Sequence, residues 1–233
     1  MSLAWHSLSS TDCVVLRTPT VAKIPKHVTY EDATVLPLGI NTAATCMFMD
    51  ETLGLKWPFS DGSKHSRGKT VLIWGASSSV GSCGVQLATH AGYEVVGVAS
   101  KRNHEMVKSL GANSCFDQSS STLADDILKS LKGKAVVGAY DAIANGTTLS
   151  TLCEILDQSG EKKLVVAVTP GAEEKATRAV KIVTNFASAW GDSDVLKAIW
   201  QWVAEAMEDD AIKYMPHSEV VGKGLEDQQK AVD

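Results

Sequence analysis

A group of small residues between two apolar segments is the part of the sequence best suited to contact a phosphate. Its members are Ala76, Ser77, Ser78, Ser79, Val80 and Gly81. The group fits the dinucleotide frame G-x-G-x-x-G, with Ala76, Ser78 and Gly81 at the three glycine positions. Small side chains let the backbone approach a pyrophosphate, whose charge is stabilised by free N–H groups at a helix start. A tight strand-to-helix turn that binds no ligand would also favour small residues, so this alternative stays open.

A second group with chemical potential lies about twenty residues after Gly81. Ser100, Lys101, Arg102 and Asn103 occupy the position where a dinucleotide-binding unit reads the adenosine ribose, and no carboxylate is among them. An acidic residue would repel a 2′-phosphate, whereas a serine and two cations can bind it, which favours NADP(H) over NAD(H). The alternative is that the two cations are merely solvated. Cations at a helix start oppose the helix dipole, and a bound anion would explain why they are tolerated there.

These two groups require a strand, a helix and a second strand to position them. Thr70 to Trp74 is β-branched or bulky and predicts a buried parallel strand. From Val80 to Ala88 apolar residues recur at helical spacing, and Glu94 to Ser100 predicts the next strand.

The same alternation continues through the rest of the chain. Further strands are expected at Ser114–Phe116, Val136–Ile143 and Lys163–Val168, with helices at His104–Leu110, Leu123–Leu131 and Leu149–Leu156. Such alternation predicts an α/β fold, a doubly wound parallel sheet of the Rossmann type with right-handed crossovers. Asp192 to Asp209 predicts an amphipathic helix whose apolar side faces the core.

Composition narrows the class of protein. The chain has 233 residues and a net charge of −5, and it lacks a basic stripe with interleaved aromatic residues, so nucleic-acid binding is not expected. No segment predicts a membrane span or a signal peptide, and we expect a cytoplasmic protein with a small-molecule substrate. The six histidines are scattered and predict no metal site. The cysteines, which form no metal-binding pair, are Cys13, Cys46, Cys83, Cys115 and Cys153.

Four stretches in combination resemble the medium-chain dehydrogenase/reductase superfamily, especially its zinc-independent quinone-reductase-like and fungal trans-acting enoyl-reductase branches. They are Ala22–Pro25 followed by Ala33 and Leu36–Gly39, Gly75–Gly81 with Gln86–Ala88, Ser100–Asn103, and Leu110–Asn113 with Asp117. The resemblance covers about residues 12–233. It implies an NADPH-dependent reductase that transfers hydride to an enone, a quinone or an enoyl thioester.

The resemblance also implies a division of the chain. Residues 1–30 would be the tail of a GroES-like catalytic domain, residues 31–215 the Rossmann domain, and residues 216–233 the start of the return to the catalytic domain. Only a remnant of the catalytic domain would then be present, and no residue is assigned as catalytic. We therefore expect an exposed apolar face around Leu36–Phe48 and beside Thr169, where a second copy or a partner could bind. The alternative function is a non-catalytic NADPH-binding or interaction protein.

Five more residues gain a role through the resemblance. Ile40 and Thr42, in the helix that follows Leu36, and Val168 and Thr169, after the fifth strand, would lie near the nicotinamide. Asn145, after the fourth strand, would contact a ribose. Simple packing, or a turn in the case of Asn145, is the alternative for each of them.

Overall fold

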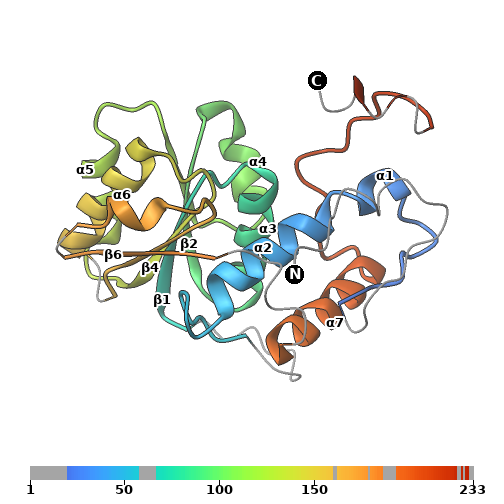
Figure 1. The fold of residues 1–233 in the computed structure, drawn as a ribbon, viewed down its shortest axis with the longest axis horizontal. Helices are drawn as coiled ribbons and strands as arrows, with labels where there is room; N and C mark the ends of the chain where they lie inside the picture. The colour runs from blue at the N-terminus through green and yellow to red at the C-terminus, as the bar shows by residue number, and fades with distance from the viewer. Residues whose placement is uncertain are drawn as a thin grey trace.

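A parallel β-sheet forms the centre of the computed structural model, which describes residues 20–57, 67–159, 162–177, 179–185, 193–224, 227 and 229–230. Six strands follow the order β3-β2-β1-β4-β5-β6 (Figure 1). They are β1 (Lys69–Trp74), β2 (Glu94–Ala99), β3 (Ser114–Asp117), β4 (Ala135–Asp141), β5 (Leu164–Ala167) and β6 (Lys181–Thr184). The predicted doubly wound fold is therefore confirmed. The direction of winding reverses between β1 and β4, where sheets of this type form a ligand crevice.

The last strand, β6, was not predicted from the sequence. It has four residues and pairs in parallel with β5, from Leu164 opposite Lys181 to Ala167 opposite Thr184. Only Ile182 among its residues is fully buried. A strand this short, with a charged residue and a threonine at its ends, lacks the apolar run that marks the central strands.

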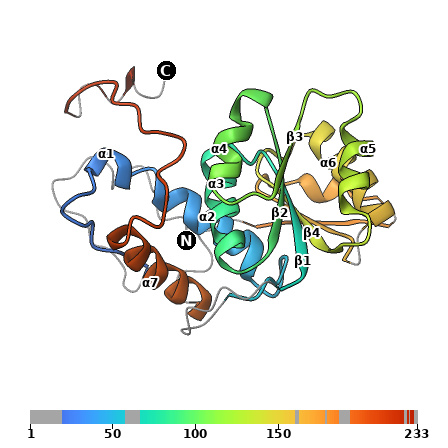
Figure 2. The same ribbon diagram turned by 180° about the vertical axis from the view of Figure 1, so that it is seen from behind.

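Helices cover both faces of the sheet. They are α1 (Tyr30–Ala33), α2 (Leu36–Phe48), α3 (Ser79–His90), α4 (His104–Ser109), α5 (Leu123–Leu131), α6 (Gly146–Ser159) and α7 (Asp194–Glu208), with single 3₁₀ turns η2 (Lys101–Asn103) and η3 (Ala172–Lys175). One face is covered by α5 and α6, and the other by α3 and α4 with α2 beside them (Figures 1 and 2). Alternate residues of a strand point to opposite faces, so Leu72 joins the core under α5 and α6 while Ile73 joins the core under α2 and α3.

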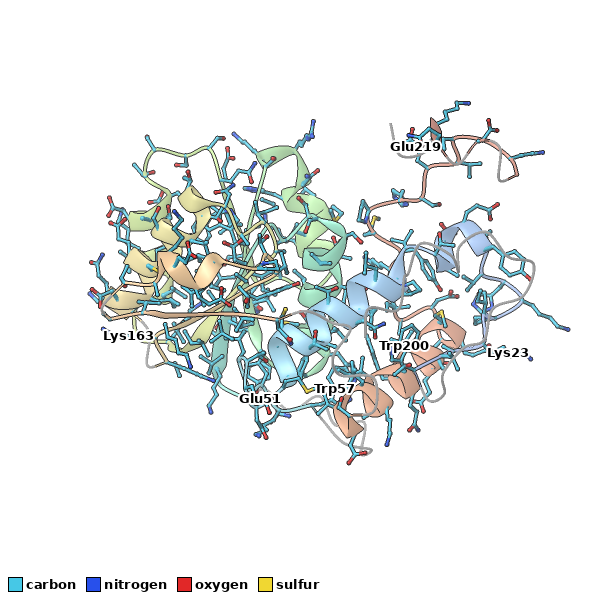
Figure 3. All side chains as sticks on the ribbon, in the orientation of Figure 1. Lys23, Glu51, Trp57, Lys163, Trp200 and Glu219 are labelled. Atoms are coloured by element: carbon cyan, nitrogen blue, oxygen red, sulfur yellow. The ribbon has the colours of Figure 1, made fainter. Side chains whose placement is uncertain are left out.

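The helix α7 lies on the side of α2 that faces away from the sheet (Figure 1). Its apolar side, including Leu196, Ile199 and Val203, is buried, which confirms the core function expected for this helix. Trp200 lies between α7 and α2 (Figure 3), and its Nε1 donates a hydrogen bond of 2.8 Å to Asn41 Oδ1.

The expectation of an exposed apolar face along residues 36–48 is wrong for most of that segment. Of the 13 residues of α2, nine are buried, because α3 packs on one side of the helix and α7 on another. Leu38, which is 73% exposed, and Tyr30 on α1, which is 77% exposed, are the large apolar side chains most open to solvent in this region. The sequence does not reveal that α7 returns to cover α2.

The remaining apolar surface here is concave. A groove of about 300 Å³ lies between the segment 20–24, α1, α2 and α7. Residues 1–19, which make up most of the expected catalytic-domain tail, lie outside the described residues. In the described part of the chain, no helix is both long and apolar enough to cross a membrane.

Candidate nucleotide-binding site

The turn after β1 is tight enough to bring backbone against backbone. Gly75 has φ +71°, in the left-handed region that favours glycine. A Cβ atom on Gly81 would lie 2.0 Å from the carbonyl oxygen of Gly75, so only glycine fits at position 81. This position is the third glycine of the predicted frame, whose function is close packing of helix and strand.

The start of α3 offers backbone donors at this turn. Ser78 caps the helix, and its Oγ accepts a hydrogen bond of 3.1 Å from Gly81 N. Ser79 and Val80 follow in the first turn, where N–H groups have no acceptor within the helix. Residues 77–80 are half-buried, so part of this turn is exposed to solvent. A helix start with free N–H groups and no acidic residue in its first turn suits a pyrophosphate.

The loop after β2 contacts this turn directly. Asn103 Nδ2 donates a hydrogen bond of 3.0 Å to Ser77 Oγ, which joins the two groups that were predicted separately from the sequence. Lys101 and Arg102 lie between β2 and α4 in the turn η2, are exposed, and form no ion pair with a described residue. Two cations are thus available to an anion bound beside the serine-rich turn. Their exposure also fits the alternative that they are merely solvated.

The end of β3 supplies two residues that the sequence analysis did not assign to the site. Gln118 Nε2 donates a hydrogen bond of 3.0 Å to Ser100 Oγ, and Asp117 pairs with Ala99 across the sheet. Hydrogen bonds from Ser119 hold the pKa of Asp117 below its ordinary value. Electrostatic interactions with His104 and Lys101 lower this pKa in the same direction. The predicted parallel order of the strands places the end of β3 beside Ser100. It does not predict the hydrogen bond from the Gln118 amide.

A buried carboxylate lies on the other side of the crevice, at the end of β4. Asp141 is fully buried, and it accepts hydrogen bonds from Ile143 N, Ala144 N and Thr148 Oγ1. Burial raises the pKa of Asp141, and these hydrogen bonds partly offset the increase. The sequence analysis missed this residue, although a charged residue at the end of an apolar strand is a usable signal.

Asn145 forms a turn at the start of α6, as the alternative interpretation of this residue predicted. Its Oδ1 accepts hydrogen bonds of 3.0 Å from Thr147 N and Thr148 N, which caps the start of α6. Its side chain is exposed, and the Nδ2 group has no acceptor among the described residues. Contact with a ribose stays a prediction.

The residues expected near the nicotinamide differ in their access to solvent. Ile40 is completely buried in the core, so its side chain presents no surface to a ligand. Thr42 and Val168 are half-buried and Thr169 is exposed. Val168 N donates to the carbonyl oxygen of Asp141 at 3.3 Å, which links the end of β5 to the β4 loop. Burial of Ile40 fits the packing alternative, and the proximity of all four residues to the nicotinamide stays a prediction.

Cysteine and histidine form no metal centre in the part of the chain that the structure describes, where no three or more potential ligands gather. Burial raises the pKa of Cys46 and of Cys83 to about 12, so both thiols stay protonated at neutral pH. These two residues act as small apolar side chains of the core.

The sheet order, the turn at Gly81 and the free start of α3 define a dinucleotide-binding α/β protein. The family model "Zinc-binding dehydrogenase" matches residues 79–205. The chain therefore belongs to the zinc-binding dehydrogenase family, part of the medium-chain dehydrogenase/reductase superfamily of nicotinamide-dependent oxidoreductases.

Individual relatives agree with this assignment. "Dehydrogenase orf1" of Aspergillus niger is 33% identical over 226 residues, which cover 94% of this chain and 64% of the relative. "Trans-enoyl reductase himH" of Aspergillus japonicus is 36% identical over 216 residues, which cover 91% of this chain and 61% of the relative. The chain thus spans somewhat less than two thirds of the length of these proteins.

Solved structures share the fold at lower sequence identity. The putative NADPH:quinone reductase from Bacillus thuringiensis superposes with a TM-score of 0.69 at 19% identity, over 92% of this chain and 62% of that one. The CurK enoyl reductase gives a TM-score of 0.62 at 21% identity, over 84% of this chain and 57% of that one. At these identities the likeness shows the fold alone.

Proposed function

We propose that this chain is the NADPH-binding part of an oxidoreductase, with residues 31–215 as the cofactor domain. The observation that carries the proposal is the hydrogen bond of 3.0 Å between Asn103 and Ser77, which joins the cationic loop to the pyrophosphate turn. A nucleotide whose pyrophosphate lies at the start of α3 would then have its adenosine ribose beside Ser100, Lys101 and Arg102. The carboxylate of Asp117 lies near Lys101 and opposes this charge only in part.

The reaction proposed is reduction of an activated alkene, with an enoyl thioester as the preferred class and an enone or a quinone as alternatives. The similarity to the trans-enoyl reductase from Aspergillus japonicus supports this choice. When bound, the nicotinamide cofactor supplies the hydride. The residues of this chain would bind and orient the cofactor, and none of them is assigned as a proton donor. We also propose that the reaction needs no zinc.

A direct test is calorimetric titration of the chain with NADPH and with NADH. We expect NADPH to bind at least about tenfold more tightly, because the 2′-phosphate adds charge-assisted hydrogen bonds. Equal affinities would contradict the proposed cofactor. The absorbance of NADPH, followed with an enoyl thioester, an enone and a quinone, then tests the reaction. Binding without turnover of any of the three would favour the non-catalytic alternative.

Gln118 gives a smaller and separable effect. Gln118→Ala removes the amide that holds Ser100 Oγ, and we expect NADPH to bind about threefold more weakly while NADH is unaffected. Gln158→Ala is a suitable control, because this exposed glutamine, as far as the structure describes the chain, donates its hydrogen bond to Glu154 O within α6. An equal change for both nucleotides would show that Gln118 acts on the fold and not on the recognition of the 2′-phosphate.

A further inference from the structure

The carboxylate of Asp141 organises the loop that follows β4. Its Oδ1 accepts hydrogen bonds of 3.0 Å from Ile143 N and 2.9 Å from Ala144 N, and its Oδ2 accepts one of 2.6 Å from Thr148 Oγ1. A buried carboxylate is costly unless such donors surround it. The carboxylate also restrains its three donors, because displacing any one of them would leave the buried carboxylate with one hydrogen bond fewer.

The path of this loop is one that the backbone does not adopt readily by itself. Ala144 has φ +55°, in the left-handed region, which is unfavourable for a residue with a side chain. The two hydrogen bonds from consecutive N–H groups to Asp141 offset that cost. The carboxylate therefore determines where Ile143 and Ala144 lie.

Ile143 extends this control to the nucleotide site. Its side chain is 42% exposed and packs on the turn 75–81 after β1, which we call the phosphate turn. A Cβ on Gly75 would lie 2.6 Å from Ile143 Cγ1. The loop thus forms a wall of the crevice at the point where β1 and β4 adjoin.

The starts of α3 and α6 adjoin this wall, and they differ in whether their N–H groups are already hydrogen-bonded. At α6, the N–H groups of Thr147 and Thr148 are bonded to Asn145 Oδ1. At α3, Ser79 and Val80 have no acceptor within the helix. An anion would therefore bind at α3, and the rest of a dinucleotide would continue past the β4 loop toward β5 and β6.

We propose that Asp141 is a positioning residue for the half of the nucleotide site formed by β4, β5 and β6. It fixes Ile143 against the phosphate turn and holds Ala144 in its left-handed conformation, so that the wall which receives the nicotinamide ribose is formed before the cofactor binds. This inference rests on the proposed function, because it assumes a dinucleotide in the crevice. The adenosine half, at β1, β2 and β3, has no contact with this carboxylate in the described hydrogen bonds.

The test compares two ligands that occupy different parts of the site. NADPH would occupy both halves, whereas 2′,5′-ADP would occupy only the adenosine half. For Asp141→Ala, we expect NADPH to bind about tenfold more weakly and 2′,5′-ADP to bind as to the unsubstituted chain. Asp141→Asn keeps an acceptor for the two backbone N–H groups and should restore NADPH affinity to within about threefold.

Two further variants separate positioning from a general loss of stability. Thr148→Val removes one donor and should weaken NADPH about threefold, which tests the inference if Asp141→Ala does not fold. Leu152→Ala is the control, because Leu152 is a buried core residue of α6 that takes part in none of the three hydrogen bonds to Asp141. It should lower the unfolding temperature without changing either dissociation constant.

The outcomes distinguish this inference from the proposed function. An equal loss of NADPH and 2′,5′-ADP affinity in Asp141→Ala, or unchanged affinity for both, would overturn the positioning function. A chain that binds neither ligand would contradict the proposed function itself. Hydrogen exchange of the ligand-free protein then decides on the loop, since Asp141→Ala should accelerate exchange at the Ile143 and Ala144 amides. Unchanged exchange there would overturn the inference independently of any cofactor.

Discussion

Gly81→Val is expected to abolish nucleotide binding while the sheet stays folded. Even the first atom of a side chain at this position would lie 2.0 Å from the Gly75 carbonyl oxygen and 2.8 Å from its carbon. These are backbone atoms, which cannot rotate away as the end of a side chain can. The start of α3 must therefore move from the end of β1, and the N–H groups that would bind the pyrophosphate move with it. The measurement is a calorimetric titration with NADPH, accompanied by circular dichroism to verify the fold.

Cys83→Ala is the matched control for this prediction. Cys83 lies two residues further along α3 and is completely buried, but its side chain faces α2, where a Cβ on Gly39 would lie 2.6 Å from the sulfur. Removal of the sulfur should cost about 1 kcal/mol of stability and leave NADPH affinity within about twofold. If folded Gly81→Val bound NADPH normally, the phosphate turn would have been assigned to the wrong residues.

The phosphate turn could be predicted from the sequence because its determinants are local. The strand before Gly75, the cap at Ser78 and the glycine at position 81 all lie within about a dozen consecutive residues. Small residues at fixed spacing between a strand and a helix allow few other geometries. The parallel order of the strands was accessible for a similar reason, since alternating strands and helices leave little choice of connection.

The parts that could not be predicted depend on contacts between distant segments. Gln118 reaches Ser100 only because β3 pairs with β2, and Asp141 is satisfied by an α6 residue seven positions further on. The error at α2 has the same origin. The apolar side of α2 was expected to be exposed to solvent. Instead α7 covers it, and Trp200 of α7 donates a hydrogen bond to Asn41, which lies 159 residues earlier in the chain. Sequence patterns give the apolar side of a helix but not the element that packs on it.

The cations of the β2 loop should determine which nucleotide is preferred. Replacing both, in Lys101→Ala/Arg102→Ala, is expected to weaken NADPH binding about 30-fold, or ~2 kcal/mol, and to leave NADH within about twofold. The reason is that a 2′-phosphate has acceptors only, so its recognition requires donors with positive charge. At this exposed loop each cation contributes roughly 1 kcal/mol, less than a buried pair would, because solvent screens the charge.

The control must remove a positive charge from a nearby place without touching the loop. Lys108→Ala meets this need, because Lys108 is an exposed residue of α4 whose ammonium lies 3.4 Å from Glu105. Its effect on both nucleotides should be small. Rising salt should reduce the preference of the unsubstituted chain for NADPH, because screening weakens the attraction between the two cations and the 2′-phosphate, and it should not reduce the preference of the double variant any further.

An equal loss of NADPH and NADH affinity would contradict this assignment, and unchanged affinity for both would favour the solvated-cation alternative. Asp117 makes the distinction sharper. Its carboxylate is held ionised and interacts with Lys101, so removal of the two cations would leave a negative charge near the proposed place of the 2′-phosphate. Repulsion by Asp117 would then act against NADPH but not against NADH, whose ribose hydroxyl can donate to a carboxylate. The double variant should therefore reduce the preference for NADPH through two effects, and Asp117→Asn added to it should restore part of the NADPH affinity.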